Sequence, residues 1–203
     1  HLEIRYDGEI RTVNDQIERL FSVASLEEVW EETLVVLVAD HGEEFFEHEN
    51  FNHGYNAFSE ITDGVAALYW PGRLTPVKVT APTLHQDLLP TIFSVFGFEP
   101  EPLFTGLVVG DAERDHYFNL TYRVEKTHQS VSDGHTKLMY RWDDDELLGG
   151  PKYFYDLAID PGEQDNIYDP KDKRVIEMWD LLLPEVERLS SQEKGATPLN
   201  PGP

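Results

Sequence analysis

The chain has 203 residues, of which 39 are Asp or Glu and 16 are Lys or Arg, so its formal net charge is −23. This charge argues against nucleic acid as a partner, because a phosphate backbone has to be neutralised by Lys and Arg. The sequence contains no Cys, which excludes disulfides and thiolate metal sites within the chain.

The acidic residues are dispersed and are accompanied by 4 Trp, 9 Tyr and 11 Phe, a composition that favours a folded chain over an acidic tail. A dispersed acidic surface suits concentrated salt, where the Debye length falls to about 3 Å at 1 M. Two interpretations stay open: a cytoplasmic protein of a salt-accumulating halophile, or an acidic mesophilic protein. No apolar run approaches the ~20 residues of a membrane span.

The first half of the chain predicts an α/β arrangement. Residues 4–24 are expected to form a helix, because apolar residues recur at helical spacing. The continuous aliphatic run over 33–39 predicts a strand buried on both faces of an α/β sheet, and it stops at Asp40. A long functional loop is expected over 41–62, followed by a second strand of the same sheet over 65–70. The apolar positions of the helix are Ile10, Val13, Ile17, Leu20 and Phe21.

The second half of the chain has a different sequence pattern. A helix over 83–96 is expected to break after Leu89, because Pro90 lies inside it. Short strands separated by turn residues then predict a small antiparallel sheet between about 115 and 157, covered by a helix over 171–190. The strands are expected at 117–124, 129–132, 136–142 and 152–157, with a hairpin turn at Asp133-Gly134.

The residues that carry chemistry follow the first apolar strand. Asp40 and His41 come directly after it, and ligands of open α/β sheets bind beyond the carboxyl ends of strands. A carboxylate and an imidazole together form half of a metal coordination shell, and Gly42 permits the turn that brings both side chains to one point. His53 is a further donor that could contact an anionic ester, whereas His48 is expected to be solvated.

Residues 32–48, followed by Phe51-Asn52-His53-Gly54, resemble the second metal-binding motif of sulfatases in the alkaline phosphatase superfamily. Residues 6–15 are similar to the helix before that strand, and residues 87–97 to the helix after the next one. Residues 155–167 resemble the carboxy-terminal motif of the family, which favours sulfatases over the phosphotransferases that share Asp-His-Gly.

This resemblance implies the second half of an alkaline-phosphatase-like sheet with a small C-terminal antiparallel subdomain. It implies that Asp40 and His41 bind a divalent metal, calcium or magnesium, and that His53 contacts the sulfate group as a catalytic residue. The expected domains are residues 1–112 of the α/β core, the small subdomain over 113–192, and a disordered tail over 193–203. The family often has Arg-Val-Pro where this chain has residues 63–66, so contacts there are expected to differ.

The resemblance also implies parts that this chain lacks. Sulfatases carry paired acidic metal ligands and a Cys-x-Pro-x-Arg or Ser-x-Pro-x-Arg motif that supplies a formylglycine nucleophile, and neither is present here. We therefore expect a fragment of a sulfate-ester hydrolase that is inactive without its N-terminal half. The alternatives are a phosphoester or phosphonate hydrolase of the same superfamily, or a non-catalytic structural or binding module. A fragment of this kind should expose apolar surface, and it should form homo-oligomers or require high salt.

Overall fold

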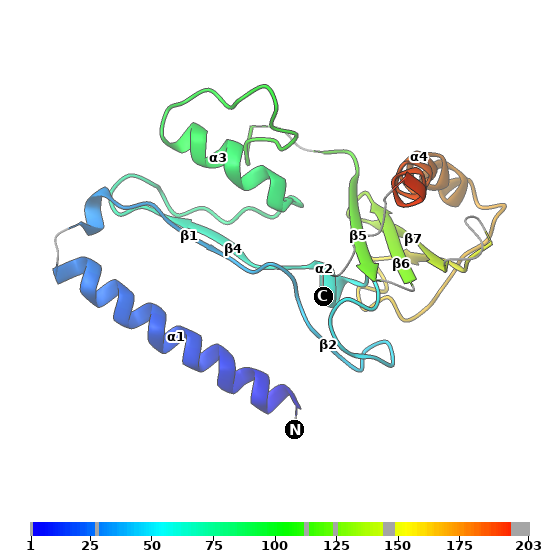
Figure 1. Ribbon diagram of the computed structural model, residues 1–203, viewed down its shortest axis with the longest axis horizontal. Helices are drawn as coiled ribbons and strands as arrows, with labels where there is room; N and C mark the ends of the chain where they lie inside the picture. Colours follow the sequence, from blue (N-terminus) through cyan, green and yellow to red (C-terminus); the bar gives the residue numbers. More distant parts are fainter. Residues whose placement is uncertain (1, 27–28, 112–113, 124–125, 144–148, 196–203) are drawn as a thin grey trace, which may run out of the picture.

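The structure is a computed structural model that combines helices with antiparallel sheets, and the α/β class is confirmed (Figure 1). One region extends to residue 111 and contains two short sheets and three helices that flank them; the other begins at residue 114 and contains a larger sheet. The described residues are 2–26, 29–111, 114–123, 126–143 and 149–195.

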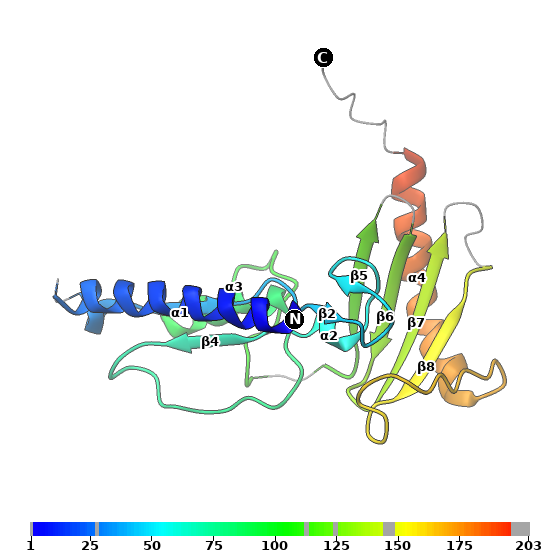
Figure 2. The same ribbon diagram turned by 90° about the horizontal axis from the view of Figure 1, so that it is seen from below.

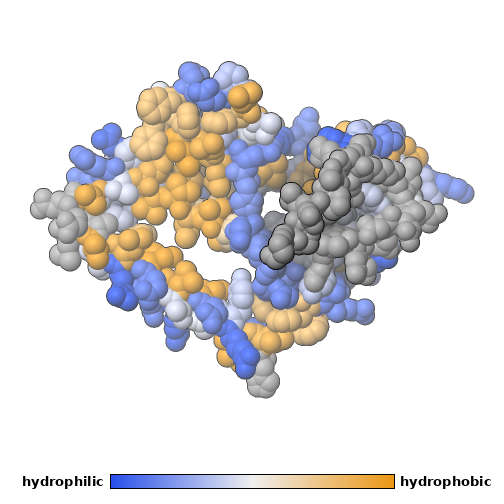
Figure 3. Space-filling view, in the orientation of Figure 1, coloured by the Kyte–Doolittle hydropathy of each residue, from blue (hydrophilic) through white to orange (hydrophobic). Residues whose placement is uncertain are grey.

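Helix α1 (Leu2–Leu26) confirms the predicted amphipathic helix, but its apolar stripe is exposed. Ring contacts join it to the rest of the chain near its two ends, where Tyr6 lies against Phe45 and Phe21 against Trp30, at centroid distances of 5.1 and 4.7 Å. The space-filling view shows an opening between the middle of α1 and the apolar residues that gather over the neighbouring sheet and helix (Figure 3). Helix α1 therefore adds little buried area to this chain.

Strands β1 (Val35–Val38) and β4 (Ala66–Tyr69) form one two-stranded sheet, as expected. The two strands run antiparallel, and β1 is not buried on both faces within this chain, since Leu37 is 48% exposed. An aliphatic run indicates that a strand suits an apolar environment, but it carries no information on strand direction. The register pairs Val38 with Ala66, so the residues after β1 lie beside those before β4.

The segment expected to be one irregular loop contains three small elements. Strands β2 (Glu44–Phe45) and β3 (Phe51–Asn52) form an antiparallel hairpin, and helix α2 (Ser59–Thr62) follows. Two-residue strands are too short to show a period of two in the sequence, which explains why they were not predicted. The hairpin loop also uses left-handed backbone at non-glycine residues, with φ of 76° at Phe46 and 66° at Glu49.

The helix predicted over 83–96 begins later and is not broken at its proline. A single 3₁₀ turn, η2 (His85–Asp87), leads into α3 (Leu88–Val95). Pro90 lies in the first turn of α3, where its missing N–H removes no intrahelical hydrogen bond. The buried carboxylate of Asp87 accepts hydrogen bonds from the amides of Leu84 and Leu107 and forms an ion pair with Arg114.

The second region confirms the predicted antiparallel sheet and its helix. The strands are β5 (Tyr117–Arg123), β6 (Lys126–Ser132), β7 (Thr136–Asp143) and β8 (Lys152–Asp156), paired in that order. Helix α4 (Lys173–Gly195) covers one face of this sheet and contains Pro184 (Figure 2). Their shared core consists of Val131, Leu138, Tyr140, Trp142, Phe154, Val175, Met178, Leu182 and Val186.

The turn between β6 and β7 confirms the hairpin signal. Asp133 Oδ1 accepts hydrogen bonds from the amides of His135 and Thr136, and Gly134 has a φ of 85° that a side chain would disfavour. Residues 193–195 of the expected tail belong to α4, and residues 196–203 lie outside the described residues. In the part of the chain that the structure describes, no helix combines the length and the apolar character needed to cross a membrane.

Candidate active site

The site begins at the carboxyl end of β1. Asp40 Oδ1 accepts a hydrogen bond from the amide of His41 at 3.0 Å, and Asp40 Oδ2 lies 3.7 Å from His41 Nε2. The carbonyl of Ala39, one residue earlier, accepts a hydrogen bond from His85 Nε2 at 2.8 Å. The two residues predicted as metal ligands are therefore adjacent in space, and His85 is a contact that the sequence did not indicate.

Gly42 is required by close packing rather than by its backbone angles. A Cβ at this position would lie 2.1 Å from the carbonyl oxygen of Glu60, a distance that no side chain tolerates. The amide of Gly42 donates to the carbonyl of Ile61 at 2.8 Å. The turn that carries His41 therefore packs directly on α2, and the position of α2 determines the position of this turn.

The β2–β3 hairpin brings His53 to the same place. The rings of His41 and His53 have centroids 4.1 Å apart. Pairing of Glu44 with Asn52 in the hairpin places the preceding Glu43 beside His53, and Glu43 Oε2 lies 3.3 Å from His53 Nδ1. The Glu43 carboxylate is largely buried and holds one side of the His53 ring, which was not predicted.

The expectation that His48 is solvated is wrong. Its side chain is only 10% exposed and stacks on Phe58 with ring centroids 3.5 Å apart. His48 Nδ1 lies 2.5 Å from Glu60 Oε1, and Nε2 donates to the carbonyl of Glu163 at 2.9 Å. The partner at residue 163 is 115 positions away in the chain, so no local pattern could have indicated it.

Glu44, His48 and Glu60 bring three donor atoms within 4.8 Å of one another. These possible ligand atoms already have hydrogen-bond partners. Glu44 accepts hydrogen bonds from the amides of His48 and Asn50 and from the side chain of Asn56. Both nitrogens of His48 also have partners, Glu60 on Nδ1 and the carbonyl of Glu163 on Nε2. The group is better explained as the polar core of the loop than as a metal centre.

Asp40 and His41 have the chemistry that a divalent metal requires. His41 Nδ1 lies 2.8 Å from the carbonyl oxygen of Gly42, which can only accept a hydrogen bond. The proton of the neutral imidazole is therefore on Nδ1. The lone pair of Nε2 is then available to a metal, as in metal-binding histidines. The side chains of Asp40 and His41 are 89% and 40% exposed, so an ion can reach them from solvent. These two residues fit a metal, although one carboxylate falls short of the charge that calcium sites collect.

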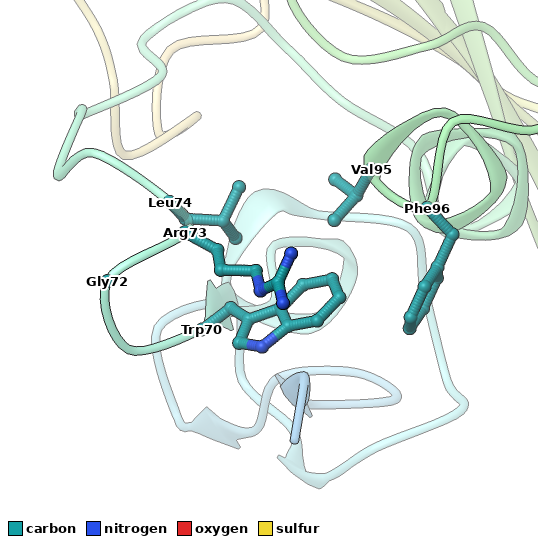
Figure 4. Close-up of a pocket in the computed structure, with 6 residues that line it drawn as sticks. All are labelled: Trp70, Gly72, Arg73, Leu74, Val95 and Phe96. Carbon is teal, nitrogen blue, oxygen red and sulfur yellow. The ribbon is translucent and has the colours of Figure 1, made fainter. Parts of the chain in front are cut away.

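The described surface also has a hollow of about 560 Å³, lined by residues at the end of β4 and of α3 (Figure 4). The guanidinium of Arg73 lies 5.1 Å from the centre of the Trp70 ring. This hollow is at the opposite end of the β1–β4 sheet from Asp40, because Val38 pairs with Ala66 and Val35 with Tyr69. It is not part of the candidate site.

Comparison with known proteins agrees with the motifs. The sulfatase family model matches residues 4–98, which include Asp40, His41 and His53. A curated relative, the Δ4,5-hexuronate-2-O-sulfatase of Bacteroides thetaiotaomicron, is 26% identical over 192 residues, covering 85% of this chain and 38% of the relative. Residues 4–98 are thus similar to the sulfatase family, and the curated relative extends that similarity over most of the chain.

Solved structures confirm the fold. A 2-O glycosaminoglycan sulfatase has a TM-score of 0.66 at 21% identity, with 82% of this chain and 39% of that chain covered. A protein solved with its substrate D-glucosamine-2-N,6-O-disulfate has a TM-score of 0.66 at 18% identity, with coverage of 95% and 41%. The chain therefore spans about two fifths of the length of the relatives that it matches.

Proposed function

We propose that residues 1–203 carry one part of the active site of a sulfate-ester hydrolase. In this proposal Asp40 and His41 are ligands of a divalent metal, calcium or magnesium, and His53 contacts the sulfate group. The observation that carries the proposal is the convergence of these three side chains at the end of β1, with the two imidazole rings 4.1 Å apart. Their positions agree with the sulfatase motif, and residues 4–98 match the family model.

The chemistry assigned to each residue follows from its surroundings. When bound, the metal would act as a Lewis acid toward a sulfuryl oxygen. His41 would present Nε2 because Gly42 holds its other nitrogen. His53 would present Nε2 because Glu43 lies against Nδ1, and it would stabilise negative charge that develops on the ester.

We further propose that the nucleophile, a formylglycine, comes from residues outside this chain, because the sequence has no Cys and no Ser-x-Pro-x-Arg. This chain alone is then inactive. A carbohydrate sulfate is the first substrate class to test, because the curated relative acts on a hexuronate sulfate by its name. A phosphoester or phosphonate hydrolase and a non-catalytic module are the alternatives.

The proposal includes a partner surface. We propose that residues 1–112 are the α/β core segment and that residues 113–192 form a subdomain attached to it. The exposed apolar residues of α1, β1 and β4 are the surface on which an N-terminal half of the hydrolase would dock. Without that half, the chain is expected to self-associate at low salt, and light scattering would then give a mass above that of a monomer.

Calcium and magnesium titration calorimetry tests the metal assignment. Two protein ligands and one carboxylate should give only weak binding, and Asp40→Ala should abolish it. Asp111→Ala, which removes a carboxylate at an exposed position outside the motif, is the control. Submicromolar affinity that disappears in Asp40→Ala would show that this chain holds a complete site, contrary to the proposal.

Activity is tested in a longer chain that contains residues 1–203 and a formylglycine motif upstream. His53→Ala and Asp40→Ala should each lower turnover of an aryl sulfate by at least about 100-fold. Greater activity on the matching phosphate ester would favour the phosphohydrolase alternative. If neither substitution affects turnover, His53 and Asp40 are not part of the active site, contrary to the proposal.

A further inference from the structure

Glu163 lies in the loop that follows β8, yet its side chain is buried. Its residue is 1% exposed, and the Lys137 ammonium on β7, also buried, forms an ion pair with Oε1 at 2.9 Å. Two buried charges must gain well-placed partners to offset the loss of water. The second carboxylate oxygen provides one: Oε2 accepts a hydrogen bond from the amide of Ser59 at 2.7 Å.

The backbone of Glu163 makes a second connection to the same loop. Its φ is 52°, in the left-handed region that a glutamate adopts only at a cost, and its carbonyl accepts the hydrogen bond from His48 Nε2. The neighbouring Gln164 donates to the carbonyl of Glu47 at 3.2 Å. Side chain and backbone at residues 163–164 therefore hold the segment 47–59 at separate points.

These contacts lead to the candidate site through α2. Ser59 is the first residue of α2, and Ile61 within α2 accepts the hydrogen bond from the amide of Gly42. Glu60, also in α2, lies so close to Gly42 that no side chain fits there. Gly42 is bonded directly to His41 and Glu43, so a shift of α2 would move both residues.

We propose that Glu163, paired with Lys137, is a positioning residue of the candidate site. It acts from the second region of the chain by fixing the first turn of α2, which in turn fixes the turn at residues 41–43. This inference rests on the proposed function, because it assumes that His41 and His53 do the chemistry. Glu163 and Lys137 touch neither the metal ligands nor the ester in this arrangement.

The sharpest test removes the amide of Ser59 and leaves the ion pair in the chain. Ser59→Pro does so, because proline suits the first helical position and Phe58, with φ −69° and ψ 160°, has the backbone that a residue before proline requires. Ser59→Ala keeps the amide and removes only the hydroxyl, which is 3.4 Å from Lys137 Nζ, so it is the matched control. Glu163→Gln is the companion variant.

The readouts are amide hydrogen exchange and the ring ¹⁵N signals of His41 and His53 in residues 1–203, and neither needs a metal or an active enzyme. In Ser59→Pro and Glu163→Gln, the amide of Gly42 should exchange at least about tenfold faster and the two ring signals should move, while amides paired between β6 and β7 keep their protection. Ser59→Ala should match the unmodified chain.

Two results would overturn the inference. One is unchanged exchange of Gly42 and unchanged ring signals in Ser59→Pro, which would make Glu163 a stabilising residue of the second region alone. The other is an equal loss of protection throughout β6 and β7. If Glu163→Gln does not fold, Ser59→Pro and Ser59→Ala decide the question. Failure of the calcium titration would refute the metal assignment without altering these exchange rates, so the two proposals fail separately.

Discussion

The two regions of the chain bury their apolar residues to different extents. From residue 114 onward, a four-stranded sheet and α4 enclose a core in which Leu138, Tyr140 and Phe154 are completely buried. Before residue 112, the equally apolar side chains of α1, β1 and β4 are about half exposed, as at Val13 and Leu37. The second region has its own core, whereas the first leaves exposed the apolar side chains that we propose as a partner surface.

The candidate site lies on the less buried region but is tied to the better packed one. Asp40, His41 and His53 come from the β1 end and the β2–β3 hairpin, and Glu163 connects that loop to β7 through Lys137. A rigid support beneath an exposed site is an arrangement that keeps side chains oriented. The difference between the regions can be tested by matched substitutions.

The largest expected effect comes from one aromatic truncation placed in each region. Phe154→Ala removes a completely buried ring and should cost about 3–5 kcal/mol of unfolding free energy. Phe98→Ala removes a ring that is 63% exposed and should change stability by about 0.5 kcal/mol or less. Calorimetry on both variants measures the difference. Equal costs would mean that the first region is as well packed as the second.

A smaller loss of stability is expected from a substitution at Asp87, the buried carboxylate of the first region. Asp87→Ala leaves Arg114 without its ion pair and two amides without their acceptor, so it should cost about 2–3 kcal/mol near neutral pH. Asp111→Ala, the same change at an exposed position of the first region, should be close to neutral. Urea unfolding of both variants gives the comparison.

The pH dependence of this effect has a definite sign. Burial alone would raise the pKa of Asp87, but hydrogen bonds from Arg114 and from the amides of Leu107 and Leu84 outweigh it, and the pKa is lowered from 3.8. A lowered pKa stabilises the fold above the unfolded value and loses that contribution as the pH falls through the folded value. The cost of Asp87→Ala should thus shrink below about pH 3.8. A cost that grows in acid would contradict this assignment.

The sequence predicted the elements that have long, clear patterns. The aliphatic runs gave β1 and β4, and turn residues such as Asp133 and Gly134 marked the hairpins of the second sheet. Strand direction was not predictable, because an aliphatic run is the same whether its strand runs parallel or antiparallel to its neighbour. Within the site, the motif indicated Asp40, His41 and His53, and the structure places them together while their roles stay predictions.

What the sequence missed in the site depends on distant contacts. Glu163 belongs to a motif that indicated the family, yet nothing local linked it to Ser59, 104 residues earlier. His48 looked like a loop histidine because Phe58 and the Glu163 carbonyl, which bury it, are reached only after folding. Residues whose surroundings come from another region cannot be assigned from local patterns.

The smallest expected effect concerns Asp63, which lies where the two regions meet and where the chain departs from the common Arg-Val-Pro of the family. Partial desolvation raises the pKa of the Asp63 carboxyl above 3.8; Lys137 opposes the shift and the Glu163 carboxylate adds to it. A raised pKa stabilises the fold below the unfolded value, and that contribution is lost as the pH rises through the folded value. Ionised Asp63 is therefore unfavourable at neutral pH.

Asp63→Asn should accordingly raise the melting temperature slightly at pH 7, and the gain should disappear near pH 3, where the unfolded carboxyl is also protonated. Asp115→Asn makes the same change at an exposed position in the second region and should leave the melting temperature unchanged at both pH values. Thermal unfolding of the three proteins at pH 7 and pH 3 provides the measurement. A lower melting temperature for Asp63→Asn at pH 7 would mean that attraction to Lys137 exceeds the desolvation of Asp63 and its repulsion by Glu163. Asp63 would then be a third member of the ion pair that joins the two regions.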